Sequence, residues 1–306
     1  MGPYILRRVL YSVFVLWGAL TVIFVMVRLV PGDPAQMLLG AQATAEEVDA
    51  LRAEAGLDQP ILIQYGRFLQ DAVRLDFGTS LRLQVDALEA VVQRFPATAL
   101  LAVAGIIIAI VISLPMGIGA ALAPSSILDR IVSVLSILGQ SVPGFWLGIM
   151  FILIFARSLQ WLPSAGIGGW QHLLMPAFTL ALPLIGILTS LVRAGLLEVL
   201  NEDYVRTAYA KGLPRRTVIV RHAFKNALIP VVTVLGLQFG SLLAGAVIVE
   251  TVFAWPGSGR LLVDAISNRD YAIIQTAILL ITATFVFINL LIDVSYAYLD
   301  PRIRYD

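Results

Sequence analysis

The chain of 306 residues contains no cysteine and only two histidines, His172 and His222. Without cysteine the protein forms no disulfide and holds no iron–sulfur cluster through thiolates of its own. The two histidines fall in different predicted loops, so a histidine-based metal site within one chain is not expected. The sequence also lacks a Gly-x-x-x-x-Gly-Lys-Ser/Thr loop, which excludes the usual way of binding ATP. We therefore expect no cofactor in this chain.

Charged residues are scarce as well. They make up 13% of the chain, whereas about a quarter is usual for a soluble domain. Hydrophobic residues account for 59%, and the mean hydropathy is +0.88. This composition excludes an ordinary soluble domain and predicts a protein embedded in a membrane.

Six apolar segments are long enough to cross a bilayer, which takes roughly 20 residues. They run approximately over Val9–Val30, Ala97–Ala123, Ile131–Phe155, Leu173–Val192, Leu228–Val249 and Ala272–Val294. Within these boundaries the second to fifth segments contain no charged residue and no histidine. Proton-driven transporters usually carry ionisable groups at mid-depth, and hydrolases need a nucleophile with its base, or a metal. The sequence shows neither, so we expect a chain that is not an enzyme.

Basic residues gather on one side of these segments. An even number of spans places both termini on that side, together with the 193–228 connection and these residues: Arg7, Arg8, Arg130, Arg193, Arg206, Lys211, Arg215, Arg216, Arg221, Lys225, Arg302 and Arg304. Short cytoplasmic loops carry an excess of Lys and Arg. The acidic residues between Asp33 and Glu89 lie on the opposite side. We therefore predict that both termini and the 193–228 connection are cytoplasmic.

The connection Asn201–Pro230 carries clear helix signals. Asn201 can cap a short helix with Glu202 and Asp203 in its first turn, and Lys211 lies in its last turn. Gly212 and Pro214 then end that helix, and a second stretch alternates apolar residues with arginines and lysines. Short connections suffice between spans, so this segment indicates a docking surface for a cytoplasmic partner. The alternative is a pair of helices lying on anionic lipid.

The run YVRTAYAKG followed by RHAFKNALIP resembles the cytoplasmic coupling loop of ABC importer permeases, in the form used by the dipeptide/oligopeptide/nickel branch. The general motif is Glu-Ala-Ala, three residues, Gly, nine residues and Ile-x-Leu-Pro. Ala208 and Gly212 fit it, whereas Arg206 stands at the Glu position and residues 222–225 replace Ile-x-Leu-Pro. The peptide-branch form matches better. Other resembling segments are LRRVLYSV, RLVPGDP, RFPATALLA, VPGFWLG, VETVFAWPGSGRLLVDAI and LDPRIRY, which span nearly the whole chain.

The resemblance is strongest to the B-type permease subunit of dipeptide importers. It implies a paralogous permease, two ABC ATPase subunits that hold ATP and Mg, and an extracytoplasmic solute-binding protein as partners. It also implies that coupling to the ATPases runs through Glu202, Asp203, Tyr204, Val205, Arg206, Ala208, Lys211 and Gly212.

The 31–95 insertion is too long for a turn. Thr44 and Glu47 form a capping-box pattern that opens a helix to about Ala55. Pro60 suits the first turn of a second helix, whose Ile61, Tyr65, Phe68 and Leu69 share one face. We expect a small extracytoplasmic helical cap packed on the spans, which either shields the pore mouth or contacts the binding protein.

Few polar side chains remain in the spans. Gln140, Gln238 and Asn289 are candidates to line the transport pathway, and both glutamines serve equally well as packing groups. Outside the spans, the loop after Glu250 contains a rigid turn formed by Trp255, Pro256, Gly257 and Gly259. The resemblance places this loop at the extracytoplasmic pore mouth, and a membrane-interface loop anchored by Trp255 is the alternative.

The predicted fold is an all-α polytopic membrane protein with six transmembrane helices. Residues 1–94 comprise the first span and the insertion, residues 95–295 the permease core with its coupling loop 201–230, and residues 296–306 a cytoplasmic tail. The predicted function is the permease subunit of an ATP-driven importer of short peptides in a prokaryotic cytoplasmic membrane. The same importer class also serves nickel chelates, glutathione and haem-like ligands. A stand-alone channel, a secondary transporter and a membrane enzyme are competing hypotheses.

Overall fold

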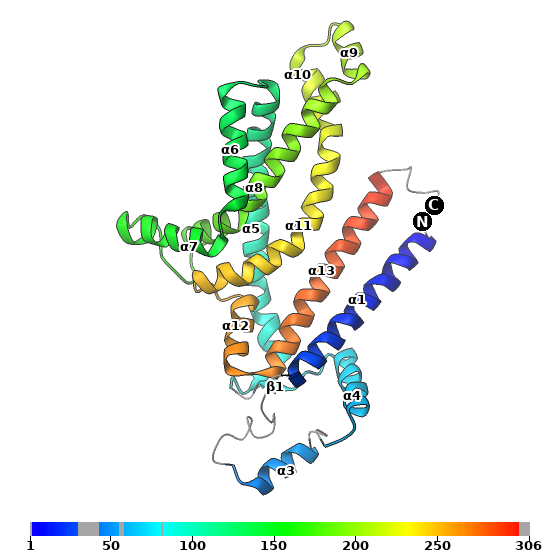
Figure 1. Cartoon of the computed structure of the whole chain (residues 1–306), viewed down its shortest axis with the longest axis vertical. Helices are drawn as coiled ribbons and strands as arrows, with labels where there is room; N and C mark the ends of the chain where they lie inside the picture. The colour runs from blue at the N-terminus through cyan, green and yellow to red at the C-terminus, as the bar shows by residue number, and fades with distance from the viewer. Residues whose placement is uncertain (1, 30–42, 55–57, 81, 300–306) are drawn as a thin grey trace. The chain divides into compact units, whose positions relative to one another are not determined.

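The computed structural model describes residues 2–29, 43–54, 58–80 and 82–299 (Figure 1). These residues divide into two compact units. The first unit combines residues up to Arg94 with those from Leu261 onward, and the second comprises Phe95–Arg260. The predicted permease core 95–295 is thus divided after Arg260, because the last helices pack with the N-terminal part of the chain.

In the first unit, the long helices α1 (Gly2–Leu29) and α13 (Tyr271–Leu299) pack side by side (Figure 1). Between them in sequence come α3 (Ala45–Glu54), α4 (Ile61–Arg74), a hairpin of β1 (Thr79–Ser80) and β2 (Val85–Asp86), and the start of α5 (Ala87–Leu122). Helix α12 (Ser258–Asn268) packs against α5 and α13. Small side chains allow these helices to approach closely. The buried residues there are Ala87, Ala90, Val91, Leu261, Ala265, Ile273 and Ala277.

The predicted helical insertion is confirmed. Glu47 accepts a bond from the Thr44 amide (2.9 Å) while the Glu47 amide donates to Thr44 Oγ1 (3.3 Å), which is a capping box. The next helix, α4, packs on α1 through Tyr65 and Phe68, whose ring centroids lie 5.0 and 5.5 Å from that of Phe24. Ile61, expected on the same face, is exposed.

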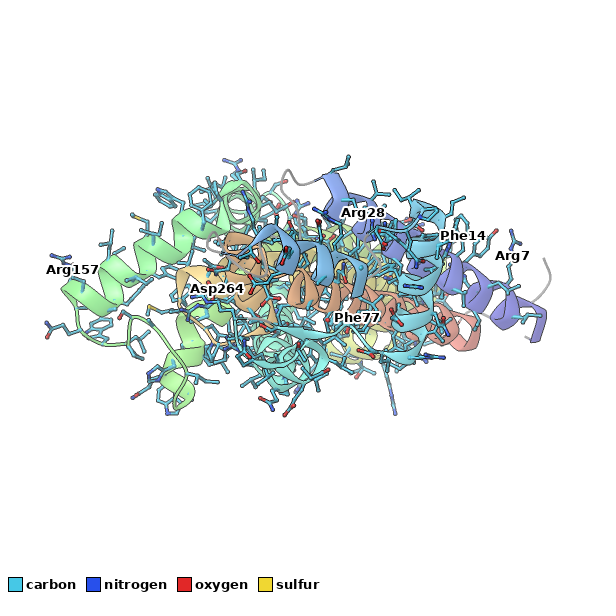
Figure 2. All side chains as sticks on the ribbon, turned by 90° about the horizontal axis from the view of Figure 1, so that it is seen from below. Arg7, Phe14, Arg28, Phe77, Arg157 and Asp264 are labelled. Atoms are coloured by element: carbon cyan, nitrogen blue, oxygen red, sulfur yellow. The ribbon has the colours of Figure 1, made fainter. Side chains whose placement is uncertain are left out.

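A polar bond strengthens the packing of α4 on α1. Arg28, labelled in Figure 2, donates to Gln64 Oε1 at 2.8 Å, and its guanidinium lies over the Phe24 ring. The cap is therefore joined to the first span by both apolar and polar contacts.

The second unit is organised around α8 (Trp170–Leu200), which packs against α6 (Ile127–Ser141) and α11 (Phe224–Val252). The close approach of α6 to α8 requires a glycine, since a Cβ on Gly186 would lie 2.3 Å from the Ser136 carbonyl oxygen. A partly buried ion pair joins the same two helices, with Arg193 donating through two nitrogens to the Asp129 carboxylate. Short elements complete the unit: α7 (Gly144–Phe151), η1 (Ile152–Ser158), α9 (Asp203–Ala210), α10 (Arg215–Thr217) and η2 (Val218–Ala223).

The segment Ile131–Phe155, predicted as one span, is formed by two helices rather than one. Helices α6 and α7 with η1 meet at a bend of 102°. Pro143 disfavours the helical conformation of the residue before it, and Val142 is accordingly extended (φ −79°, ψ 124°). In the described part of the chain, five helices are long and apolar enough to cross a membrane, and the bent pair makes six if it counts as one span.

Candidate functional site

The predicted coupling segment begins directly after α8. Asn201 is the C-cap of α8 and Glu202 the N-cap of α9, so the prediction that Asn201 caps the short helix was wrong. The Asn201 side chain instead donates to the Leu197 carbonyl at 2.9 Å. The physical reason is that α8 continues to Leu200, which leaves two residues between the helices. A movement of α9 therefore passes through a very short link to α8.

The end of α9 confirms the role predicted for Gly212 as a helix stop. Its φ is +79°, in the left-handed region that glycine adopts without strain. The Gly212 amide donates to the Tyr209 carbonyl (2.9 Å), and the Leu213 amide donates to the Ala208 carbonyl (3.3 Å). These two bonds form a Schellman motif, which fixes where the helix ends and where the chain goes next.

One face of α9 is buried within this chain. Val205 and Ala208 pack against Val218 of η2, with Val199, Leu200 and Leu213 around them. The coupling role of Ala208 stays a prediction, and in this chain its side chain is covered by the coupling segment itself. Val205 has the same surroundings. Both residues make the segment a folded body that is fixed to the start of α11 through η2.

The opposite face of α9 is exposed and polar. The side chains of Asp203 and Arg206 are 97% and 71% exposed, and their ion pair at 3.5 Å contributes little stability in water. Tyr204 and Tyr209 are also exposed, and the Asn226 side chain donates to the Tyr204 hydroxyl at 2.8 Å. Glu202, Lys211, Arg216, Arg221 and Lys225 extend this exposed surface. Aromatic and charged side chains on a braced helix are suited to binding a partner.

At its other end, α11 carries a buried carboxylate that the sequence analysis missed. Glu250 lies within α11 and is 0% exposed. Thr98 Oγ1 donates to its Oε1 at 2.6 Å, and the Arg260 amide donates to its Oε2 at 2.9 Å. Thr98 has one hydroxyl proton, so its oxygen is left to accept from the Ser258 amide, at 2.8 Å. The carboxylate thus joins α5, α11 and the first turn of α12.

The Trp255–Arg260 turn closes over this carboxylate, and we call the turn together with Thr98 and Glu250 the Glu250 clasp. A Cβ on Gly257 would lie 2.2 Å from Glu250 Cδ, and one on Gly259 would lie 2.8 Å from Val247 Cα. Trp255 is 1% exposed and donates from Nε1 to the Ala97 carbonyl at 2.9 Å. In the turn predicted to lie at the pore mouth, Trp255, Gly257 and Gly259 are thus buried and Pro256 is half-buried.

A sequence signal for Glu250 was available. It is the only acidic residue between Asp203 and Asp264, and it stands between two apolar runs just before a glycine-rich turn. The predicted fifth span ended at Val249, one residue too early to include it. A carboxylate with this setting must find hydrogen-bond donors on folding, because burial of an unpaired charge is very costly.

The three predicted pathway residues lie in different local surroundings. Gln238 lines a cavity of about 170 Å³ in the second unit, together with Thr179 and Ser241 and otherwise mainly apolar groups. Gln140 donates to the Ser136 carbonyl of its own helix at 3.0 Å, and Asn289 donates to the Phe285 carbonyl at 3.0 Å. Asn289 belongs to the other unit. Among the described residues, no group of three acidic or histidine side chains could hold a metal ion.

Comparison with known proteins extends over the whole chain. The family model described as binding-protein-dependent transport system inner membrane component matches residues 113–305, and the model of its N-terminal part matches residues 1–102. The chain is 41% identical over 305 residues to the glutathione transport system permease protein GsiC of Salmonella paratyphi A. It is 40% identical to the proteins of that name in Escherichia coli K12 and Shigella dysenteriae serotype 1. These alignments cover 100% of both chains.

Proposed function

This chain belongs to the family of binding-protein-dependent transport system inner membrane components, and we propose that its cargo is a short peptide. It is a multi-pass permease of an ABC importer, and the relatives that it matches are named as permease proteins. The observation that carries the proposal is the full-length identity of about 40% to permeases named for glutathione, which is itself a tripeptide. Glutathione and simple dipeptides are the first cargoes to test. Nickel chelates and haem-like ligands remain the alternatives.

The proposed complex contains this chain, a paralogous permease, two ATPase subunits and an extracytoplasmic binding protein. The binding protein delivers the peptide, and ATP with Mg is bound and hydrolysed by the ATPases. Closure of the ATPase pair moves the coupling segment, and the spans alternate access by rigid-body movement. This chain contributes binding and movement but no covalent chemistry.

In this proposal the exposed face of α9 binds the ATPase through Asp203, Tyr204, Arg206 and Tyr209. The buried face, with Val205 and Ala208, keeps α9 attached to η2. Because two residues link α9 to α8 and η2 continues into α11, a push on α9 reaches both helices. Those two helices pack on each other in the second unit, so they are suited to move together.

We propose that the coupling segment faces the cytoplasm with both termini, and that α4 and the Glu250 clasp lie on the other side. The clustering of basic residues supports this orientation. Single cysteines test it, because the native chain has no thiol background. In sealed cells, an impermeant maleimide should label Asp71→Cys in α4 and leave Arg216→Cys unlabelled. Labelling of position 216 from outside would reverse the orientation.

Uptake into proteoliposomes tests the function itself. The chain should co-purify with ATPase subunits, and the reconstituted complex should accumulate labelled glutathione or dialanine only with ATP and the binding protein. A stand-alone channel would let the cargo equilibrate without ATP. Uptake of neither peptide, with uptake of a nickel chelate or of haem, would overturn the peptide proposal and keep the importer.

A further inference from the structure

The first unit contains a pocket of about 370 Å³ whose lining residues belong neither to the coupling segment nor to the Glu250 clasp. It is lined by residues of the β1–β2 turn, α5, α12 and the start of α13. Its polar side chains are Arg82, Arg94, Asp264, Asn268 and Asp270, and Leu261 and Ile273 contribute apolar surface. Asp264 is labelled in Figure 2. A pocket of this size matches those that bind small molecules.

The frame of this pocket is well defined. Ser80 is fully buried and donates to Asp270 Oδ2, while it accepts from the Leu83 amide at 3.0 Å. Asp270 Oδ1 also accepts from the Ile273 amide at 3.3 Å, in the first turn of α13. These bonds fix the hairpin against α13, so the turn that carries Arg82 is held at the edge of the pocket.

The two arginines differ from the rest of the lining. Within the described residues, neither Arg82 nor Arg94 makes a hydrogen bond or an ion pair. Two arginines that line one concavity suit a carboxylate, because each guanidinium group presents several fixed N–H donors. The Asp264 and Asp270 carboxylates in the same pocket suit an ammonium group.

We propose that this pocket binds the zwitterionic end groups of a short peptide, with the carboxylate on Arg82 and Arg94 and the ammonium near Asp264 and Asp270. This inference rests on the proposed peptide cargo and adds a recognition site for it on the permease. Lining residues of both charge signs favour a ligand that carries both charges over a purely acidic or basic one. The apolar surface of Leu261 and Ile273 would receive a side chain of the peptide.

The probe is labelled dialanine, with N-acetyl-dialanine and dialanine amide as the forms that lack one charge. Binding is measured by equilibrium dialysis on the complete permease–ATPase complex in lipid nanodiscs, without the binding protein. We expect dialanine to bind at least about tenfold more tightly than either blocked form, since each lacks one charge-assisted interaction. Arg94→Gln and Arg82→Gln should each weaken dialanine binding about tenfold and leave binding of dialanine amide unchanged. Arg67→Gln, an exposed arginine of α4, is the matched control and should have no effect.

Three results would overturn the site. The first is that the native complex does not bind dialanine. The second is that the arginine variants lose binding of dialanine and of dialanine amide equally, which would indicate a structural effect. The third is that the arginine variants bind the peptide normally but dock the binding protein more weakly. This result would show that the pocket receives an acidic side chain of that partner. Peptide uptake by the native complex separates this outcome from failure of the proposed function.

Discussion

Helix α11 joins two segments that need a glycine for different physical reasons. At its start, the coupling segment needs Gly212 for a left-handed backbone, and a Cβ there would meet nothing within 4 Å. At its end, the Glu250 clasp needs Gly257 because a Cβ would overlap the carboxylate. The first segment displays charge to solvent, whereas the second buries a carboxylate. A glycine in a motif thus reports either a conformation or a lack of space, and substitutions distinguish the two.

The largest expected effect is that of Gly257→Ala. Its new methyl group would lie 2.2 Å from Glu250 Cδ, so the turn or the carboxylate must move. We expect a loss of stability of about 3 kcal/mol or more, at the upper end for overpacking. Size-exclusion chromatography of the heated permease pair should show loss of the assembled form. Gly144→Ala is the control, because its Cβ would meet nothing within 4 Å. If both variants retain the assembled form to the same temperature, the clasp does not enclose the Glu250 carboxylate closely.

Glu250→Gln should have the next largest effect. The glutamine amide keeps the size of the side chain but replaces one carboxylate oxygen by an NH2 group. This donor would face the donors of Thr98 and Arg260, which bind the two oxygens of Glu250. An unsatisfied buried polar group costs about 1–3 kcal/mol. Glu198→Gln, at an exposed position of α8, should change stability by less than about 0.5 kcal/mol. If the two glutamine variants have the same melting temperature, the carboxylate does not stabilise the clasp.

Gly212→Val should affect coupling more than folding. A β-branched residue in the left-handed region costs about 1–2 kcal/mol locally, which is too little to unfold the spans. We expect normal membrane insertion and pairing, a sharp fall in peptide uptake, and ATP hydrolysis that no longer responds to cargo. Gly212→Asn is the matched control, since asparagine tolerates this conformation, and it should retain most activity. Similar uptake by both variants would show that the Schellman turn is not needed for coupling.

The smallest effect concerns Glu47, an exposed carboxylate that accepts the same kinds of bond as Glu250. Bonds from the Thr44 amide and hydroxyl lower the pKa of Glu47 below its ordinary value of 4.5. Its stabilisation of α3 is therefore present above pH 4.5 and lost as the pH falls through the lowered folded-state pKa. Hydrogen exchange of the first-turn amides of α3 should rise over this range, after correction for intrinsic rates, and Glu47→Gln should remove the dependence. An unchanged profile in the variant would exclude this cause.

Much of the architecture could be predicted from the sequence because its signals are local. Apolar length identified the spans, the Thr44–Glu47 spacing identified the capping box, and Gly212 before Pro214 identified the end of α9. Each depends on residues a few positions apart, where backbone preferences act directly. The resemblance in the coupling segment identified the importer family for the same reason, since its motif is contiguous.

Other features were decided only by tertiary structure. The 102° bend at Pro143 depends on whether neighbouring helices accept two short helices in place of one span, and a proline alone does not determine that. The burial of Ala208 depends on Val218 folding back over α9. The role of Glu250 depends on Thr98, which is far away in sequence and supplies the hydroxyl that its carboxylate requires. Local propensity thus determined where helices begin and end, whereas the partners of buried polar groups were determined by packing, because they come from distant parts of the chain.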